Sequence, residues 1–406
     1  MATQTGYKAS ELGIIPQDWE VVELGEVCNY IGSGTTSTKG AGNFLLYGST
    51  GIIGTCEYAK YAGDAILVAR VGANAGQVSS VSGRYGVSDN TIIIQVKNPI
   101  NYFFIKNILQ FRNLNTLIFG SGQPLITGTQ LKNFKIAIPK STIEQTAIAT
   151  ALSDTDALIS SLQTLIAKKK AIKLSAMQNL LSGKIRLPEF AQRPDGSPKP
   201  TRQTELGLLP EDWEVVELGE VAEIQRGASP RPIDSPIWFS QSSNIGWLRI
   251  SDVTKSEKYL YNTTQNLSEE GIKNSRYIAK DNLIMSICAT VGKPIINKKN
   301  ICVHDGFVVF GNPKFDIEFM FYVLQEYESK WINQGQTGSQ MNLNTDLIKN
   351  KIVCLPPLPE QTAIAQLLSD MDAEIEALEG RLKKTQSLKQ GMMQALLSGK
   401  IRLPLK

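Results

Sequence analysis

The residues whose types could carry out catalysis form few groupings in this sequence. It holds one histidine, His304, followed by Asp305, and this pair could form half of an acid–base site. No nucleophilic side chain has a positional reason to lie beside it. Asp316, Glu328 and Lys330 faintly imitate the acid, acid and lysine of a metal-dependent nuclease, but they fall in a helical pattern with no strand to present them. We therefore expect no catalytic site in this chain.

Metal and nucleotide sites also lack their signatures. The five cysteines include no Cys-x-x-Cys pair, so a zinc site lacks ligands, and we expect buried free thiols instead. No Gly-x-x-x-x-Gly-Lys-Ser/Thr loop occurs, and no Asn-Pro-Pro-Tyr or Asp-Pro-Pro-Tyr stretch of the kind that adenine methyltransferases use to hold a flipped base. We expect neither a cofactor nor a metal in this chain.

Composition and charge are those of a globular protein without a membrane segment. No apolar run of about 18 residues and no signal-like N-terminus occurs, so we expect a cytoplasmic protein. The net charge of +4 is unevenly spread: residues 205–225 carry seven acids and no base, whereas residues 226–299 carry eleven Lys and Arg against six acids. A basic face coexisting with an acidic edge and a mixed solvated surface both fit, and charge alone favours the second.

The sequence consists of one unit used twice. Residues 11–27 recur as residues 205–221 with 14 of 17 positions identical. Glu144-Gln-Thr-Ala-Ile-Ala recurs from Glu360, and Leu180-Leu-Ser-Gly-Lys-Ile-Arg-Leu-Pro recurs without change from Leu396. The interiors 28–140 and 222–355 share only faint echoes, and the second copy is longer by 22 residues. A repeated frame therefore surrounds two different contents.

A long helix is predicted after each interior. The first runs from Ser141, which opens a Ser141-x-x-Glu144 capping box, to Gly183, and the second from about Pro359 to Gly399. Mostly apolar residues at steps of four and three form a seam in both helices, typical of a coiled coil. The seam residues are Ile148, Leu152, Thr155, Ile159, Leu162 and Ile166, matched by Ile364, Leu368, Met371, Ile375, Leu378 and Leu382.

Each seam is then interrupted, by Lys169 and Lys173 in the first helix and by Thr385 and Lys389 in the second. We expect the packing face to rotate there, toward Ile172 and Leu388. The matching seams favour pairing of the two helices over the alternative, in which each helix packs only on its own globular domain.

The interiors mix short strands and helices. Helical patterns cover residues 102–112 and 317–331, and a polar linker at residues 188–200 is predicted to be extended and exposed. Predicted strands are residues 65–71, 91–96 and 135–138 in the first copy and residues 247–250, 282–287, 307–310 and 351–355 in the second.

In their order and duplication these motifs resemble the specificity subunit of a type I DNA restriction-modification system. The marks are the Leu-Gly-x-x-Pro-x-Asp-Trp-Glu opening at 12–20 and 206–214, the Pro-x-x-x-x-Glu-Gln-x-x-Ile run at 139–148, and the Leu-Leu-Ser-Gly-Lys-Ile ending. The resemblance covers nearly the whole chain. It implies a mixed α+β fold with internal pseudo-two-fold symmetry. Its predicted segments are a target-recognition domain at 1–140, a spacer helix at 141–186, a linker at 187–204, a second target-recognition domain at 205–355 and a second spacer helix at 356–406, the helices forming an antiparallel coiled coil.

The resemblance also implies a division of labour. Each domain would read one half of a bipartite, non-palindromic target in double-stranded DNA, while the helices space the halves and dock two methyltransferase subunits. S-adenosylmethionine would belong to those methyltransferase subunits, and ATP and Mg²⁺ to restriction subunits, so this chain would be non-catalytic. A helix of about 40 residues is about 60 Å long and limits the half-site separation to about 18 base pairs.

Base reading uses Arg or Lys at guanine and Asn or Gln at adenine, while phosphate contacts fix the register. Candidates in the first domain are Lys39, Arg70, Asn74, Arg84 and Gln123. Candidates in the second are Arg226, Arg231, Arg249, Arg276, Lys293, Lys298 and Lys299. The alternative for each is an ordinary surface side chain, because the family offers no fixed contact motif here. The rival function is a duplicated scaffold that holds two proteins and does not bind DNA; the basic cluster at 226–299 favours DNA.

Overall fold

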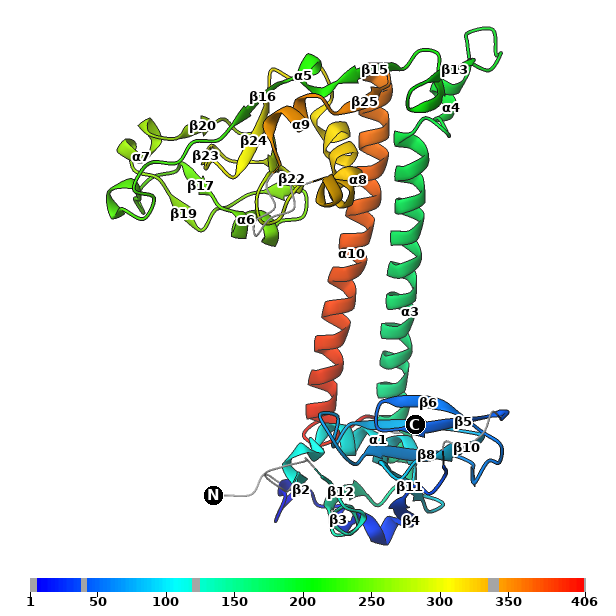
Figure 1. Cartoon of the computed structure of the whole chain (residues 1–406). Coiled ribbons are helices and arrows are strands. Elements are labelled where there is room, and N and C mark those ends of the chain that lie inside the picture. The colour runs from blue at the N-terminus through cyan, green and yellow to red at the C-terminus, as the bar shows by residue number, and fades with distance from the viewer. Residues whose placement is uncertain (1–5, 38–41, 119–124, 335–342, 405–406) are drawn as a thin grey trace. The chain divides into compact units, whose positions relative to one another are not determined.

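The computed structural model describes residues 6–37, 42–118, 125–334 and 343–404 (Figure 1). The chain forms two compact units, called here unit 1 (residues 1–165 and 378–406) and unit 2 (residues 166–377). Each unit contains one head of mixed strands and helices and a segment of both long helices, α3 (Thr142–Leu181) and α10 (Leu358–Leu396). The boundaries of the five segments given above stay predictions.

Two four-stranded sheets form the head of unit 1, in the orders β4-β11-β8-β9 and β6-β5-β10-β7. The middle strands β8 and β11 are apolar and buried, and helix α1 (Tyr102–Phe111) packs its buried residues into the same core. The strands are β4 (Cys28–Ser33), β5 (Phe44–Gly48), β6 (Gly51–Cys56), β7 (Tyr61–Ala62), β8 (Ala65–Ala69), β9 (Val78–Val81), β10 (Arg84–Val87) and β11 (Thr91–Val96). Two short helices, η2 (Leu114–Leu117) and α2 (Gly128–Lys132), complete the head.

The head of unit 2 repeats this plan with one more strand. Its sheets have the orders β16-β24-β21-β22-β18 and β19-β17-β23-β20, and helix α8 (Ile317–Gln334) takes the place of α1. The strands are β16 (Glu223–Arg226), β17 (Gly246–Leu248), β18 (Tyr259–Leu260), β19 (Gln265–Asn266), β20 (Arg276–Ile278), β21 (Leu283–Ser286), β22 (Pro294–Asn297), β23 (Ile301–Val303) and β24 (Phe307–Gly311). The short helices are η3 (Pro236–Trp238), α6 (Ile250–Lys255), α7 (Glu269–Lys273) and α9 (Thr345–Lys349).

Much of the extra length of the second copy lies in one connection. In unit 1 the turn Ser49–Thr50 joins β5 to β6, whereas in unit 2 residues 249–264, with α6 and β18, join β17 to β19. Sheet pairing identifies these as equivalent places, because β5 and β17 are each parallel to the neighbouring strand, β10 or β23. The insertion therefore adds a helix and an edge strand to the second head only.

The repeated sequence forms the same small frame in both units. In unit 1 a hairpin of β1 (Tyr7–Ser10) and β2 (Gly13–Pro16) leads to β3 (Trp19–Glu23) and η1 (Leu24–Val27), and β3 pairs with β12 (Lys135–Pro139). In unit 2 the same roles fall to β13 (Thr201–Thr204), β14 (Gly207–Pro210), β15 (Glu214–Glu217), α5 (Leu218–Val221) and β25 (Ile352–Leu355). Trp19 and Trp213 are buried in the two cores.

An ion triad ties the end of a long helix into each frame. In unit 2, Arg186 donates to Asp212 (2.8 Å) and Glu360 (2.9 Å). In unit 1, Arg402 donates to Asp18 (2.9 Å) and Glu144 (2.7 Å). Glu144 and Glu360 are almost fully buried. The repeated Leu-Leu-Ser-Gly-Lys-Ile-Arg ending of α3 thus belongs to unit 2, and that of α10 to unit 1.

The two long helices pair antiparallel within each unit. In unit 1 Lys389 of α10 lies 2.6 Å from Asp156 of α3. In unit 2 Lys173 lies 2.5 Å from Asp372, and Lys169 lies 2.7 Å from Glu374. The partner number falls as the residue number rises, which confirms both the pairing and its antiparallel direction (Figure 1).

The expected rotation of the seam is wrong. Ile172 and Leu388 are 44% and 60% exposed, whereas Thr385 is buried. The seam continues through its polar positions, because Thr385 donates to the carbonyl of Arg381 and the lysines pair with acids on the other helix. A lysine in a coiled-coil seam is tolerated when its charge finds a partner and its stem packs along the interface.

The other predicted elements appear close to their expected bounds, with two exceptions. Residues 247–250 end as a strand at Leu248, because Ile250 starts α6. The linker is not wholly extended: α4 (Pro188–Ala191) forms a helical turn with proline in its first position, and Gln192 bridges to Pro198. Proline suits a first helical turn, where no amide hydrogen is needed. Among the described residues, no helix is long and apolar enough to cross a membrane.

Candidate nucleic-acid interface

The two heads build the same turn in front of their central strand. Ser88 and Asp89 precede β11, and His304 and Asp305 occupy the same places before β24. Gly34 donates to the carbonyl of Thr91 (2.8 Å), and Gly227 donates to that of Phe307 (2.9 Å). A Cβ atom on Gly34 would lie 2.3 Å from Ser88 O, and one on Gly227 2.1 Å from His304 O. Both turns therefore depend on a glycine for the close approach of two backbones.

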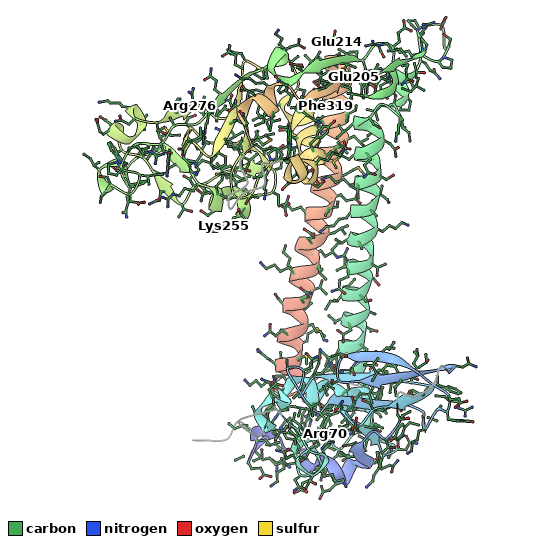
Figure 2. The ribbon with its side chains drawn as sticks, viewed as in Figure 1. Arg70, Glu205, Glu214, Lys255, Arg276 and Phe319 are labelled. Carbon is green, nitrogen blue, oxygen red and sulfur yellow. The ribbon has the colours of Figure 1, made fainter. Side chains whose placement is uncertain are left out.

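In unit 2 two arginines donate to one aspartate of this turn, and a third arginine donates to the backbone of the first. Arg226 donates through Nε to the Asp305 carbonyl (2.6 Å), and Arg231 donates through Nη2 to the Asp305 carboxylate (2.9 Å). Arg276 donates to the carbonyl of Arg226 (2.6 Å) and to the side chain of Gln225 (2.5 Å). The cluster is positively charged overall, and Figure 2 shows Arg276 at its place in the head. It holds guanidinium groups in fixed orientations, as bidentate recognition requires.

Asp305 organises this cluster and was not predicted as a site residue. Burial alone would raise the pKa of Asp305, but the hydrogen bond from Ser229 and the charge of Arg231 more than offset it and lower the pKa. The neighbouring Arg231 side chain is 70% exposed, so its remaining donors face solvent. The sequence signal that would have found Asp305 is its position in the turn that repeats Asp89.

Arg249 lies near the same turn, since its charge acts on His304, the residue before Asp305. Its backbone N–H donates to Asp252 (3.0 Å) at the start of α6. Burial lowers the pKa of His304, and the charges of Arg249 and Arg226 lower it further, against the opposing effect of Asp305. A lowered pKa leaves this histidine neutral at pH 7. Four of the predicted arginines therefore surround one corner of the head.

The three predicted lysines of unit 2 lie elsewhere in the head. Lys298 pairs with Asp281 (2.8 Å) and lies over the ring of Tyr259, while Lys299 donates to Asn266 (3.3 Å). Lys293 follows the loop after β21, and its charge acts on Glu328. These lysines are not part of the arginine cluster.

Among the described candidates of unit 1, Arg70 contacts the equivalent turn; Figure 2 labels its place in the head. Its backbone N–H donates to Asn90 (2.9 Å) and its Nη1 to the carbonyl of Asp89 (3.2 Å). Its buried Nε has no partner among the described residues. Arg226 and Arg70 thus both donate to the carbonyl of the aspartate in the shared turn.

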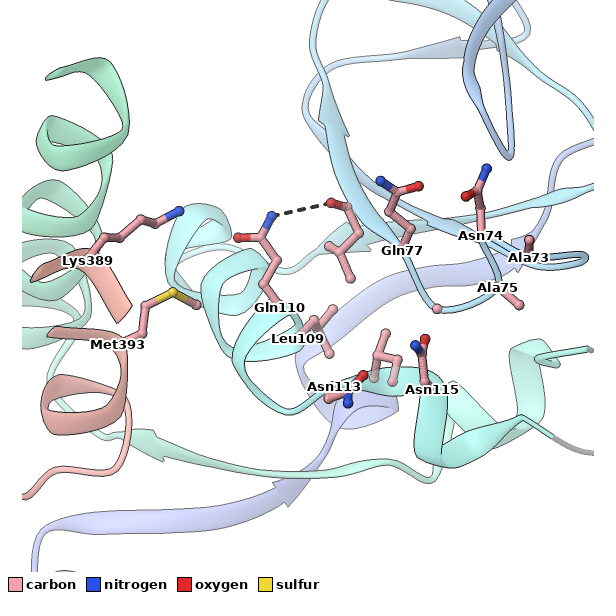
Figure 3. Close-up of a pocket in the computed structure, with 13 residues that line it drawn as sticks. Ala73, Asn74, Ala75, Gln77, Leu109, Gln110, Asn113, Asn115, Lys389 and Met393 are labelled. Atoms are coloured by element: carbon pink, nitrogen blue, oxygen red, sulfur yellow. Dashed lines mark hydrogen bonds between the residues drawn. The ribbon is translucent and has the colours of Figure 1, made fainter. Parts of the chain in front are cut away.

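The remaining candidates of unit 1 are dispersed. Arg84 begins β10 and lies 5.2 Å over the ring of Phe44. Asn74 belongs to the loop after β8 and lines a pocket of about 510 Å³ (Figure 3). Lys39 and Gln123 lie outside the described residues.

The residues considered for catalysis do not converge. Asp316 caps α8 by accepting from the N–H of Phe319 (3.0 Å), and Lys330 lies 3.7 Å from Glu326. Cys288 and His304 both approach Gly306, a proximity that the sequence did not reveal. Burial raises the pKa of the Cys288 thiol, which disfavours the nucleophilic thiolate.

The five cysteines are free thiols. Cys28, Cys56 and Cys302 are buried as predicted, and Cys288 and Cys354 are half-buried. Burial raises the pKa of Cys28 to about 12 and that of Cys302 to about 11. In the part of the chain that the structure describes, no group of three or more His, Cys, Asp and Glu could hold a metal ion.

Known proteins match this chain along almost its whole length. It is 28% identical over 417 residues to the MjaVIII type I restriction enzyme specificity subunit of Methanocaldococcus jannaschii, over 96% of this chain and 94% of that one. It is 22% identical over 413 residues to the EcoDI specificity subunit of Escherichia coli, over 96% and 89%.

The fold is similar to the crystal structure of a type I restriction-modification S subunit from M. genitalium, with a TM-score of 0.63 at 14% identity over 93% of this chain and 96% of that one. Residues 16–171 and 210–386 each match the family described as the type I restriction modification DNA specificity domain. The chain therefore belongs to the family of type I restriction-modification DNA specificity domains, of which it holds two copies.

Proposed function

We propose that this chain is the specificity subunit of a type I restriction-modification complex, in which each head reads one half of a bipartite, non-palindromic DNA target. The observation that carries this proposal is a turn that both heads share but that contacts different arginines in each head. In unit 1 Arg70 donates to the carbonyl of Asp89. In unit 2 Arg226 donates to the carbonyl of Asp305 and Arg231 to its carboxylate. A shared fold supports the same approach to DNA, and different side chains on it support different bases.

The arginine cluster suits base reading for a physical reason. A guanidinium that donates to a fixed carbonyl or carboxylate has lost much of its rotational freedom before DNA arrives. Arg231 keeps further donors for the O6 and N7 acceptors of guanine or for a phosphate. Asp305, with its lowered pKa, stays charged at neutral pH and holds the cluster together.

Docking of two methyltransferase subunits on the frame is part of the proposal. Apolar side chains are exposed at matching frame positions, Ile14 and Ile401 in unit 1 and Leu208 and Ile185 in unit 2. Such residues support contact with a partner that is present twice and recognises the same surface in both units. Helices α3 and α10, each of which begins in one unit and ends in the other, would space the half-sites.

The chemistry is assigned to the partners. We infer that S-adenosylmethionine binds the methyltransferase subunits, and ATP and Mg²⁺ the restriction subunits, while this chain is non-catalytic. The dispersal of Asp316, Glu328 and Lys330 and the raised thiol pKa of Cys288 support this.

The test is an exchange of one head. Residues 28–140 are replaced by the same region of a relative, and methylated bases are mapped in cells that also hold the methyltransferase subunit. One half of the recognised site should change and the other should stay. The matched control exchanges residues 222–355 and should change the opposite half. A change in both halves after either exchange would refute the modular reading.

The rival scaffold function is tested in the same cells. A scaffold that holds two proteins without binding DNA predicts the same methylated sequence whichever head is present. It also predicts that duplex DNA is bound no more tightly by the complex than by the methyltransferase subunit alone, with the same salt dependence.

A further inference from the structure

The two heads differ at one edge of their larger sheet. In unit 2 the outer edge of β22 is covered by β18, because Ile296 donates to the carbonyl of Lys258 (2.9 Å) and Lys298 to that of Leu260 (2.8 Å). In unit 1 the corresponding strand is β9, and no strand of the described residues pairs with its outer edge. An unpaired edge presents a row of backbone donors and acceptors to any strand that approaches.

The equivalence of β9 and β22 rests on their register and on the loops before them. Gly76 donates to Ala69 (2.9 Å) and Gly292 donates to Ser286 (2.8 Å), and both glycines have positive φ. Ser80 pairs with Ile66, which lies three residues before Ala69. Ile296 pairs with Leu283, which lies three residues before Ser286. Ser80 and Ser82 therefore take the places of Ile296 and Lys298, whose N–H groups donate to the carbonyls of β18 and of the residue before it.

The neighbouring helix shows what kind of residue the missing strand would carry. Asn101 and Asp316 cap α1 and α8 in the same way, each accepting from the N–H three residues later at 3.0 Å. Two residues after the cap, α8 has Glu318, which forms an ion pair with Lys258 and accepts a hydrogen bond from the Tyr259 hydroxyl (2.8 Å). At that position α1 has Phe103, which is 46% exposed and packs edge-on against Tyr102. An apolar side chain suits this place in unit 1, where unit 2 uses a lysine.

A pocket lies where such a strand would enter. In unit 2 the helix α6 leads into β18, and its Thr254 lies 3.4 Å from Thr290 in the loop before β22. Residues 73–76 of the equivalent loop of unit 1 line the pocket of about 510 Å³ together with Gln77, Gln110 and Lys389. Figure 3 shows this loop facing α1 across the pocket, and Gln110 donates to the carbonyl of Val78 (3.3 Å).

We propose that an extended segment of the methyltransferase subunit adds to the outer edge of β9 as a parallel strand. One apolar side chain of this segment would contact Phe103, and the residues of the segment that precede the strand would lie in the pocket. The proposal rests on the proposed function for the identity of the partner. Strand addition supplies affinity through main-chain hydrogen bonds and specificity through pockets for alternate side chains. DNA suits the site less well, because Lys389, the one cation among the residues that line the pocket, is already paired with Asp156.

The consequence is an asymmetric complex. Two methyltransferase subunits would share equivalent contacts on the repeated frame, but only the one at unit 1 gains the edge of β9, since β18 already occupies the edge of β22. The first-bound methyltransferase subunit would therefore occupy unit 1.

The direct test is amide hydrogen exchange of the full chain, free and in complex with the methyltransferase subunit. The amides of Ser80 and Ser82 should exchange fast in the free chain and at least about tenfold more slowly in the complex. The amides of Ile296 and Lys298 are the internal control and should be slow in both states. Unchanged exchange at Ser80 and Ser82 overturns the proposal, and so does protection that appears with duplex DNA alone.

Two variants test affinity. Ser80→Pro removes the outward donor, and Phe103→Glu places the acid of unit 2 at the apolar position. Each should weaken binding of the first methyltransferase subunit by about fivefold, which corresponds to about 1 kcal/mol, the usual contribution of one hydrogen bond. Ile52→Glu, at an exposed apolar residue of the other sheet, is the matched control and should bind normally. Normal binding by Phe103→Glu would overturn the strand site even where methylation maps to a split target as proposed above.

Discussion

Arg186 and Arg402 hold matching places in the repeated frame, yet their surroundings differ. The side chain of Arg186 is 8% exposed, and its partner Glu360 also accepts from the indole N–H of Trp213 (3.2 Å). The side chain of Arg402 is 37% exposed, and the indole N–H of Trp19 has no partner among the described residues. Identical residues thus form a closed network in unit 2 and a more open one in unit 1. Duplication has preserved the residue types but not their burial, and burial determines how much each triad contributes to the free energy of unfolding.

Removing the guanidinium should separate the two networks most clearly. Arg186→Met leaves the buried Glu360 without its main partner, and we expect the free energy of unfolding to fall by about 3–5 kcal/mol, the usual cost of an uncompensated buried charge. Arg402→Met should cost less, because water can reach that triad. Urea unfolding followed by tryptophan fluorescence measures both.

A double variant provides the control for this pair. Arg186→Met combined with Glu360→Gln removes the stranded charge and should recover part of the lost stability. Equal losses from Arg186→Met and Arg402→Met would contradict the role given to burial.

The interhelical lysines allow a second, smaller comparison. Asp372, the partner of Lys173, also accepts a hydrogen bond from the Tyr322 hydroxyl (2.7 Å). That hydroxyl in turn accepts a hydrogen bond from Lys258 (3.1 Å). Asp156, the partner of Lys389, is about as exposed as Asp372 (43% against 37%), so the difference between the two pairs lies in the network around Asp372. Lys173→Met should therefore lower the free energy of unfolding by about 1–2 kcal/mol, and Lys389→Met by less than about 1 kcal/mol.

Thermal unfolding of the two methionine variants checks this order. Lys168→Met, at an exposed position of α3, is the matched control and should leave stability unchanged. A larger loss from Lys389→Met than from Lys173→Met would show that the wider network around Asp372 adds nothing.

The smallest expected effect is a pH dependence. Burial would raise the pKa of Asp212, but hydrogen bonds from Arg186 and Lys199 lower it below the ordinary 3.8; the hydrogen bond from Arg402 lowers that of Asp18. A carboxyl with a lowered folded pKa contributes stability that is fully present above its ordinary pKa and is lost as the pH falls through the folded value. The stability gap between the unmodified chain and Asp212→Asn should therefore be constant from pH 7 to pH 5 and close below about pH 4. A gap that stays constant down to pH 3 would show that Asp212 titrates normally.

The frame could be predicted from sequence because its signals are local and repeated. The helical seam, the caps and the strands of β11 and β12 each arise from a few neighbouring residues, and duplication doubled every signal. The triads could not be predicted, since Arg186 meets Glu360 only after the chain has folded back on itself. The same holds for the seam lysines, whose partners Asp156 and Asp372 lie on the other helix; a polar seam position looks like an interruption until its partner is known.

In the candidate interface, residue types were easier to predict than their grouping. Arg226, Arg231 and Arg276 were named from type and segment charge, but Asp305, to which Arg226 and Arg231 donate, is an acid and carries no signal for base reading. The edge of β9, which no strand of the described residues covers, could not be predicted either, because sheet order depends on the fold and on an insertion present only in the second head.

The exchange of helix ends between the units has a temporal consequence. Unit 2 can complete its triad once Glu360 has been synthesised, whereas Asp18 and Glu144, made early, wait for Arg402. At about 5–20 residues per second, roughly 10–50 s of translation separate Glu144 from its cation. The head that leaves the ribosome first is therefore the last to be locked, and a nascent chain carries a buried carboxylate site without its counter-charge for most of its synthesis.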